Sequence, residues 1–402
     1  MKRITLTAIA CFYGLFQAFA QSASPSDSST YTDRKLRIDE VNLVSSYYHQ
    51  DGNNSAVTGG IGTEKLTDIA NSIDLKLSYR GRKNRIQSIG LDFGVDHYTS
   101  ASSDKIDPNT ITSPSYSDTR IYPSLSWTST NEKKGNSIGI AASYSHEFDY
   151  ISYGIGINYA KTSKDKSREF GVKLQSYFDT WTIIYPVELR PNGRFSGRDD
   201  QGGETTPRDS YSASFSLSQI INKRFQVAFL LDLIEQQGLL ATDYQRVYFT
   251  DASERIENLP GKRLKIPIGI RANYFLGDRI ILRGYYRFYT DDWGITAHTA
   301  SLEMPIKINP FFSVSPFYRF YVQTASQYFA PYGAHNIADA YYTSDYDLSK
   351  FTSHFIGLNL RFTPEKGVLS IKQFSAVELR YGHYIRSNGL NSNILTLAAT
   401  FK

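Results

Sequence analysis

The chain of 402 residues carries 44 basic and 39 acidic side chains, and its formal net charge of +5 is too small to indicate nucleic-acid binding. Cys11 is the only cysteine, so removal of an N-terminal signal would leave no thiol for catalysis, metal binding or an iron–sulfur cluster. The 30 tyrosines and 24 phenylalanines are typical of β-strands and of the aromatic girdles of membrane barrels, although soluble β-proteins also share this trait.

The first segment of the chain predicts export. Residues 1–20 begin with MKR, continue as an apolar run and end on Ala18 and Ala20, the A-x-A pattern that signal peptidase cuts. We expect a signal peptide at 1–20, followed by a flexible Ser-rich leader at 21–34. A lipoprotein signal that uses Cys11 is disfavoured because the apolar run continues past it. The remaining sequence has no apolar run near 18 residues, so we expect no transmembrane helix.

Segments of alternating apolar and polar residues follow throughout residues 35–402. A period of two is that of a β-strand, whose successive side chains point to opposite faces. We predict about sixteen strands, within a range of 14–18. They lie at residues 38–50, 72–80, 86–98, 119–129, 137–148, 151–160, 169–178, 210–220, 224–234, 263–275, 279–290, 296–308, 312–323, 351–362, 375–386 and 393–401.

The segment LKIPIGIRANYF at 264–275 shows the choice between two folds. Ile266, Ile268 and Ile270 alternate with polar positions that include Arg271. In a soluble sandwich the isoleucines would face a core, whereas in a membrane barrel they would face lipid and Arg271 would face the lumen.

The lengths of the links favour the barrel. Links after even-numbered segments are mostly short, and the long links follow odd-numbered segments: 51–71, 99–118, 179–209, 235–262 and 324–350. Outer-membrane barrels alternate short periplasmic turns with long outer loops in this way. We therefore predict an all-β, antiparallel, up-and-down transmembrane barrel as one domain at 35–402. Both termini would be periplasmic, in the outer membrane of a Gram-negative bacterium.

The alternation of each strand also predicts which side chains line the lumen. The later strands would contribute a basic wall, and the earlier strands a wall that is more acidic. The lumen candidates are Arg271, Arg283, Arg287, Arg319, Arg361, Arg380, Asp92, Asp96 and Glu147. Such walls could orient polar or anionic solutes, but cross-strand ion pairs that only hold the barrel's shape would give the same list.

The stretch YYRFYTDDWGITAHTA at 285–300 is the densest in chemically versatile residues. Asp292 and His298 suggest acid–base or metal chemistry, but no third ligand stands at a matching spacing. The simpler interpretation puts Trp293 in an interfacial girdle, with the aspartates capping a turn.

The glycines near the front of the chain form a second unusual stretch. Gly59, Gly60 and Gly62 do not form a phosphate loop, since no G-K-[ST] follows. The stretch GTEKLTD could start a helix, and the whole of 47–68 is expected to be an ordered loop that packs against the barrel or enters its mouth.

Four stretches together resemble an uncharacterised family of Gram-negative outer-membrane β-barrels, known as a domain of unknown function. These are residues 47–68, 244–263, 285–300 and 317–329, and the most specific part includes Asp291, Asp292, Trp293, Gly294 and His298. The resemblance implies an architecture and a location. It also implies genes encoded beside a periplasmic flavin-transferring enzyme, a small lipoprotein and thioredoxin-like proteins. It assigns no catalytic residue and no cofactor.

Three functions compete at this point. The leading hypothesis is a pore or transporter for a polar or anionic solute. The alternative is a scaffold or export partner for a periplasmic or surface redox protein or lipoprotein, and the third is a barrel enzyme, which the absence of G-x-S-x-G and H-E-x-x-H motifs disfavours. Membrane lipid is an expected partner. The barrel-assembly machinery is another, because the final strand ILTLAATFK resembles its recognition signal.

Overall fold

The computed structural model describes residues 35–99, 117–186, 189 and 204–402. The expected signal peptide (1–20) and leader (21–34) lie outside the described residues.

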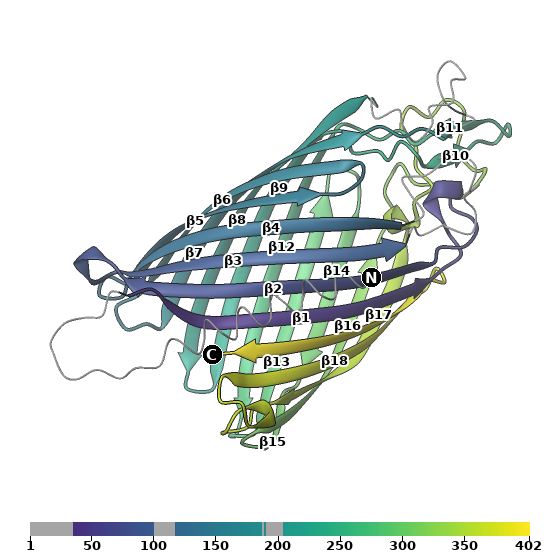
Figure 1. Ribbon diagram of the computed structural model, residues 1–402. Coiled ribbons are helices and arrows are strands. Elements are labelled where there is room, and N and C mark those ends of the chain that lie inside the picture. Colours follow the sequence, from purple (N-terminus) through teal and green to yellow (C-terminus); the bar gives the residue numbers. More distant parts are fainter. Residues whose placement is uncertain (1–34, 100–116, 187–188, 190–203) are drawn as a thin grey trace, which may run out of the picture.

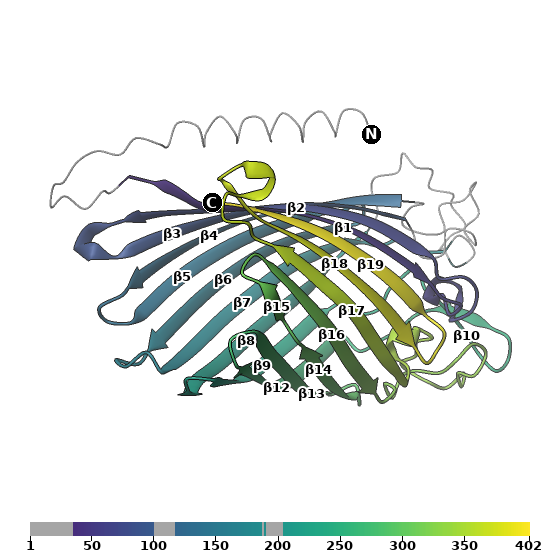
Figure 2. The same cartoon turned by 90° about the horizontal axis from the view of Figure 1, so that it is seen from below.

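The described strands form one antiparallel sheet that closes on itself (Figures 1 and 2). Each strand pairs with its neighbour in sequence, and β1 pairs with β19 to close the ring. Two short segments, β14 and β15, pair with the same two neighbours and share one place, so the ring has sixteen places. The barrel strands are β1 (Arg37–Asp51), β2 (Leu66–Arg80), β3 (Ile86–Thr99), β4 (Ser117–Asn131), β5 (Asn136–His146), β6 (Tyr150–Thr162), β7 (Arg168–Thr182), β8 (Thr205–Asn222), β9 (Phe225–Gly238), β12 (Lys262–Leu276), β13 (Ile280–Asp291), β14 (Thr296–Glu303), β15 (Ile306–Asn309), β16 (Phe312–Gln323), β17 (Phe351–Phe362), β18 (Phe374–Arg386) and β19 (Asn391–Phe401).

The sixteen-stranded barrel predicted from the alternation is confirmed, with corrections at strand ends. β2 begins at Leu66 rather than at 72, so the helix start expected within GTEKLTD is wrong; the short helix η1 (Ala56–Thr58) precedes it instead. The single strand predicted at 296–308 is interrupted between β14 and β15. Pro305 lies at this break, where it has no N–H to donate to the ladder.

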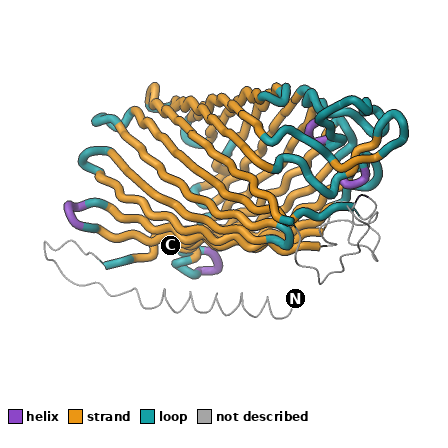
Figure 3. Tube along the Cα trace, turned by 90° about the horizontal axis from the view of Figure 1, so that it is seen from above, coloured by secondary structure: helices purple, strands orange, loops and turns teal. Residues whose placement is uncertain are grey.

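The two ends of the barrel differ, as the link lengths predicted (Figure 3). We call them the short-turn end and the long-loop end. Both described chain ends lie at the short-turn end, where Val41 pairs with Phe401. One short-turn link is longer than the others: residues 363–373 contain the helix η6 (Val368–Ser370), and Leu369 there is 82% exposed.

The outer face of the barrel is apolar. Ile140, Ile155 and Leu174 are each at least half exposed, at 52%, 57% and 50%, near the middle of three nearby strands. A soluble protein rarely leaves so wide an apolar band in water, whereas a bilayer requires it. The fold is that of a transmembrane β-barrel. None of the short helices in the described part of the chain has the length or hydropathy to cross a bilayer.

Neighbouring residues on β5 test which face contacts lipid. We expect Ile140→Lys to destabilise the barrel in lipid vesicles by about 2–4 kcal/mol, because it places a cation near the bilayer midplane. Ala141→Lys, the matched control on the other face, should cost much less. Urea unfolding followed by tryptophan fluorescence measures both, and equal losses would contradict this orientation.

Candidate lumen and mouth

One long-range ion pair identifies the inner face of the barrel. Arg380 on β18 lies 3.7 Å from the carboxylate of Glu303 on β14, although β16 and β17 separate these strands in the sheet. Side chains of non-adjacent strands meet most readily on the concave side of a curved sheet. Arg380 and Glu303 therefore face the lumen.

The strand register extends this assignment, because directly paired residues share a face. Glu303 pairs with Arg283, and residues at intervals of two continue the same face along each strand. This face carries all six arginine candidates, Arg271, Arg283, Arg287, Arg319, Arg361 and Arg380, and across the barrel it carries Asp92 and Asp96.

The arginines of β12–β18 form what we call the arginine wall. Glu303 neutralises part of it, since it also accepts a hydrogen bond from Arg283 at 3.1 Å, and Arg361 lies 3.2 Å from Glu378. Each of these ion pairs leaves its arginine about half exposed.

Aromatic rings also support the arginine wall. The guanidinium of Arg319 lies 5.0 Å from the ring centre of Phe355, and that of Arg271 lies 6.0 Å from the ring centre of Tyr285. Arg380, which is paired with Glu303, also stacks 4.0 Å from Phe317. Cation–π contacts position Arg271 and Arg319 without neutralising them, so the wall keeps positive charge for a solute.

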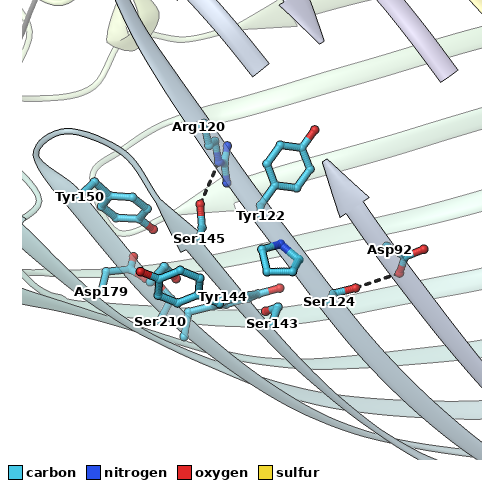
Figure 4. Close-up of a pocket in the computed structure, with 13 residues that line it drawn as sticks. Asp92, Arg120, Tyr122, Ser124, Ser143, Tyr144, Ser145, Tyr150, Asp179 and Ser210 are labelled. Carbon is cyan, nitrogen blue, oxygen red and sulfur yellow. Dashed lines mark hydrogen bonds between the residues drawn. The ribbon is translucent and has the colours of Figure 1, made fainter. Parts of the chain in front are cut away.

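The opposite wall, on β3–β8, is lined by small hydroxylated side chains and encloses a pocket of about 370 Å³ (Figure 4). We call it the serine wall. Its pocket residues include Ser124, Ser143, Ser145, Ser152, Ser210, Tyr122, Tyr150 and Tyr177. The short serine side chains leave space for this pocket between the larger tyrosine rings.

The acidic candidates are hydrogen-bonded into the serine wall. Asp92 accepts from Ser124 at 2.8 Å and Asp96 accepts from Tyr122 at 2.8 Å. Glu147 lies 3.4 Å from Arg120. These contacts hold the three acids against neighbouring strands of the serine wall.

A cluster that the sequence analysis did not single out lies on the serine wall near the long-loop end. Asp179 accepts from Arg208 at 3.0 Å, and the Arg208 guanidinium stacks 5.0 Å from Trp181 and 5.6 Å from Tyr150. Asp179 is 4% exposed. No sequence motif marks this cluster, because β6, β7 and β8 contribute its members separately.

The structure corrects the interpretation of the 285–300 motif. Trp293 is 3% exposed and does not lie in a lipid-facing girdle. Its Nε1 donates to the Lys262 carbonyl at 3.0 Å, and Arg263 stacks 4.3 Å from its ring. Asp291 caps the turn as expected, accepting from the backbone N–H groups of Trp293 and Ile295.

The remaining motif residues do not form one chemical site. The carboxylate of Asp291 binds Arg263 at 2.6 Å on the inner side, whereas His298 faces outward and contacts Tyr286. Asp292 makes backbone contacts with Leu264 and Gln327, and Gly294 takes the turn at a φ of 85°. Within the described ranges, no group of three or more His, Cys, Asp or Glu residues is placed to hold a metal ion.

Three long loops meet across the mouth at the long-loop end. We call residues 52–65, 239–261 and 324–350 the lid. The β1–β2 loop and the β9–β12 loop start eight strands apart in the ring of sixteen, and therefore from opposite sides. They nevertheless touch, because Arg246 donates to the Val57 carbonyl at 2.9 Å. The lid therefore spans the mouth.

Strand-like pairing joins two loops of the lid. Asn258 and Tyr342 exchange two backbone hydrogen bonds, and Thr250 donates to the His335 carbonyl at 3.0 Å. Phe249, which is 2% exposed, packs edge-on against Tyr342 at 4.9 Å. The hairpin of β10 (Arg246–Tyr248) and β11 (Glu254–Ile256) was not predicted from the sequence, and it shapes this contact.

The lid buries carboxyl groups. Glu257 is 5% exposed and accepts from the Thr242 N–H at 2.7 Å. Burial, and then the negative charge of Asp345, raise the pKa of Glu257 to about 8. Burial also raises the pKa of Glu64 to about 7 and raises that of Asp345. Near neutral pH, Glu257 is therefore largely protonated in the closed lid, and Glu64 is partly protonated.

Tyr244 in the lid is half-buried, and burial raises the pKa of its hydroxyl, followed by the charges of Asp149 and Glu257. The lid and the β5–β6 turn, which contains Asp149, thus both contribute acidic groups to the electrostatics of the long-loop end.

The fold and the polar lumen define a sixteen-stranded transmembrane β-barrel whose mouth is spanned by ordered loops. The particular family follows from a family model described as "Protein of unknown function (DUF3570)", which matches residues 94–374. The chain belongs to this family, which confirms the resemblance to an uncharacterised family. No curated protein sequence matches the chain.

Solved barrels are similar in shape. A mutant of the ferric enterobactin receptor PfeA from Pseudomonas aeruginosa has a TM-score of 0.46 at 10% identity, over 86% of this chain and 53% of the receptor. This chain thus spans about half of that receptor's length. OccK1 (OpdK) from Pseudomonas aeruginosa gives 0.42 at 8% identity, over 92% and 99%. A BenF-like porin from Pseudomonas fluorescens Pf-5 gives 0.42 at 9% identity, over 90% and 98%.

The buried acids predict that the lid loosens as the pH rises. A carboxyl whose pKa is raised on folding binds more protons in the folded state, so its contribution to stability falls as the pH rises from about 4.5 to about 8. Hydrogen exchange of residues 239–261 should therefore speed up between about pH 6 and about pH 9, beyond the intrinsic rise.

Glu257→Gln is the matched variant for this pH effect, because it keeps the shape and removes the titration. It should reduce the pH dependence of the corrected exchange rate. A variant that kept the full wild-type dependence would show that Glu257 does not control the lid.

Proposed function

We propose that this protein is an outer-membrane pore or transporter for a polar or anionic solute, with the lid at the cell surface and the short-turn end in the periplasm. The observation that carries the proposal is the difference between the two walls of the lumen. Small hydroxylated side chains leave space along β3–β8, and partly uncompensated arginines face that space from β12–β18.

The arginine wall supports an anionic group on the solute. Guanidinium groups bind carboxylates and phosphates through paired donors, and the Arg287 Nε is buried without a hydrogen-bond partner among the described residues. The serine wall supports a solute that also carries hydroxyl or amide groups. The lid supports regulated rather than continuous passage, because it spans the mouth.

Planar-bilayer recordings test the selectivity. Arg287→Gln together with Arg319→Gln should lower the anion-to-cation permeability ratio at least about twofold, because both remove positive charge from the lumen. Lys164→Gln, in the turn between β6 and β7, removes one charge outside the lumen and should leave the ratio unchanged. A variant barrel with wild-type selectivity would contradict a solute path along the arginine wall.

The lid gives a second test of the same proposal. Replacement of residues 241–259 by a short Gly-Ser linker keeps β9 and β12 and removes the segment that crosses the mouth. We expect conductance to rise several-fold. A truncated barrel that stays ion-tight would favour the scaffold alternative.

Exposed apolar side chains favour the scaffold as the second candidate function. Ile61, Tyr332, Ile337 and Tyr341 on the lid are each 44–47% exposed, although they lie beyond the strands that contact lipid. Leu369, at the short-turn end, is a corresponding candidate contact for a periplasmic lipoprotein or redox protein. Pull-down from detergent-solubilised membranes, with Ile337→Ser and Leu369→Ser as variants, distinguishes a surface partner from a periplasmic one.

A further inference from the structure

The histidines on the barrel strands all lie near the long-loop end. Of the seven in the sequence, His335 is buried in the lid, and the other six stand on strands, each within three residues of the long-loop end of its strand. The six are His49, His97, His146, His298, His354 and His383. They belong to β1, β3, β5, β14, β17 and β18, so they are distributed around the circumference.

All six face outward. His49 follows Tyr47 at an interval of two, and His383 follows Tyr381 in the same way; both tyrosines lie on the outer face, at 45% and 48% exposure. His146 pairs with Ile121, an outward residue at 41% exposure. The remaining three alternate or pair with outward residues in the same manner. We call this set the histidine ring.

In five of these histidines, a cross-strand hydrogen bond at Nδ1 orients the imidazole. The Nδ1 atoms of His49 and His97 lie 2.9 Å from threonine hydroxyls on the neighbouring strand, those of His298 and His354 lie 2.7 and 2.8 Å from tyrosine hydroxyls, and that of His383 lies 2.9 Å from an asparagine oxygen. Among the described residues, no hydrogen bond occupies the Nε2 atom of any of these five rings. In these five imidazoles Nε2 is therefore available for a further hydrogen bond.

Two members of the histidine ring, His298 and His354, are supported by the same arrangement of a tyrosine and a phenylalanine. In the segments YYRFYT (285–290) and FYRFYV (317–322), a tyrosine hydroxyl binds a histidine on the next strand, and a phenylalanine two residues later contacts the same imidazole at 5.4 Å. Tyr286 and Phe288 hold His298, and Tyr318 and Phe320 hold His354. Repetition of the same support indicates that the orientation of the imidazole matters.

We propose that the histidine ring binds phosphate groups of anionic membrane lipids. The inference rests on the membrane location proposed above. Outward aromatic residues at strand ends lie at the headgroup level of a bilayer, which is where lipid phosphates are. Where a hydroxyl donates to Nδ1, the proton of the neutral imidazole is on Nε2, and Nε2–H is then free to donate. His383 differs, because its Nδ1–H donates to the Asn393 oxygen. An N–H donor at the headgroup level suits a phosphate oxygen and is not useful among acyl chains.

Lipid selectivity in reconstituted vesicles tests the proposal. The protein is inserted into phosphatidylcholine vesicles with a trace of spin-labelled phosphatidic acid or spin-labelled phosphatidylcholine. Electron paramagnetic resonance then gives the fraction of each lipid held at the protein surface. We expect a preference of about fivefold for phosphatidic acid, because its phosphate has more unshielded anionic oxygens to accept from the imidazole N–H groups.

Glutamine variants provide the comparison. His49→Gln, His97→Gln and His383→Gln together should lower the preference clearly, and replacement of all six histidines should bring it close to one. His335→Gln, in the lid, is the matched control and should behave as the wild type. A sixfold variant that keeps the wild-type preference overturns the proposal, as does a wild type that shows no preference.

Two readouts separate this proposal from the membrane location. If no lipid of either kind is motionally restricted, and the gel migration of the protein does not depend on heating, the barrel is not inserted and both proposals fail. Restricted lipid without a preference for phosphatidic acid overturns the histidine ring alone.

Discussion

The structure depends on one constraint, which is that backbone N–H and C=O groups inside a bilayer must bond to each other. The barrel satisfies this constraint by pairing β1 with β19, from Val41 with Phe401 to Asp51 with Asn391. Once this seam closes, inside and outside are fixed for every strand, and alternation assigns each side chain to lipid or to the lumen. Pro305 shows how the constraint is met locally: its missing donor falls between β14 and β15, while its carbonyl still accepts from Ile281 at 3.0 Å.

The sequence predicted the parts of the fold that this constraint makes periodic. Sixteen strands and the asymmetry of the link lengths follow from local patterns, because a residue's face depends only on its parity. Prediction was wrong where polar and apolar residues occupy both faces, as in Leu66–Asn71 at the start of β2, where Leu66 and Asp68 share one face. It was also wrong for Trp293, which packs against Tyr328 from a different loop. A contact of this kind leaves no trace in the residues next to the tryptophan.

The lid shows the same limit for the candidate site. Gly59 and Gly60 were noticed as unusual, but the reason for them is not local: both have positive φ, and a side chain on either would collide with another loop, at Tyr248 or at the Ser344 carbonyl. Glu257 and Asp345 come together from loops far apart in the sequence, so their shared burial, and hence their raised pKa values, could not be inferred from spacing.

If the solute is an anion, the acidic groups of the lid must not prevent it from reaching the arginine wall. Ionised acids across the mouth would repel an anion before it reached the arginine wall. Burial keeps Glu257 largely protonated at neutral pH, so this acid adds little negative charge to the closed lid. Arg386, at the long-loop end of β18, forms an ion pair with Asp347 in the lid, which offsets part of the remaining acidic charge. Ionisation of the buried acids and loosening of the lid are therefore linked, since the buried carboxylates regain solvation only when the loops separate. The same burial that suppresses negative charge in the closed state thus makes the closed state sensitive to pH.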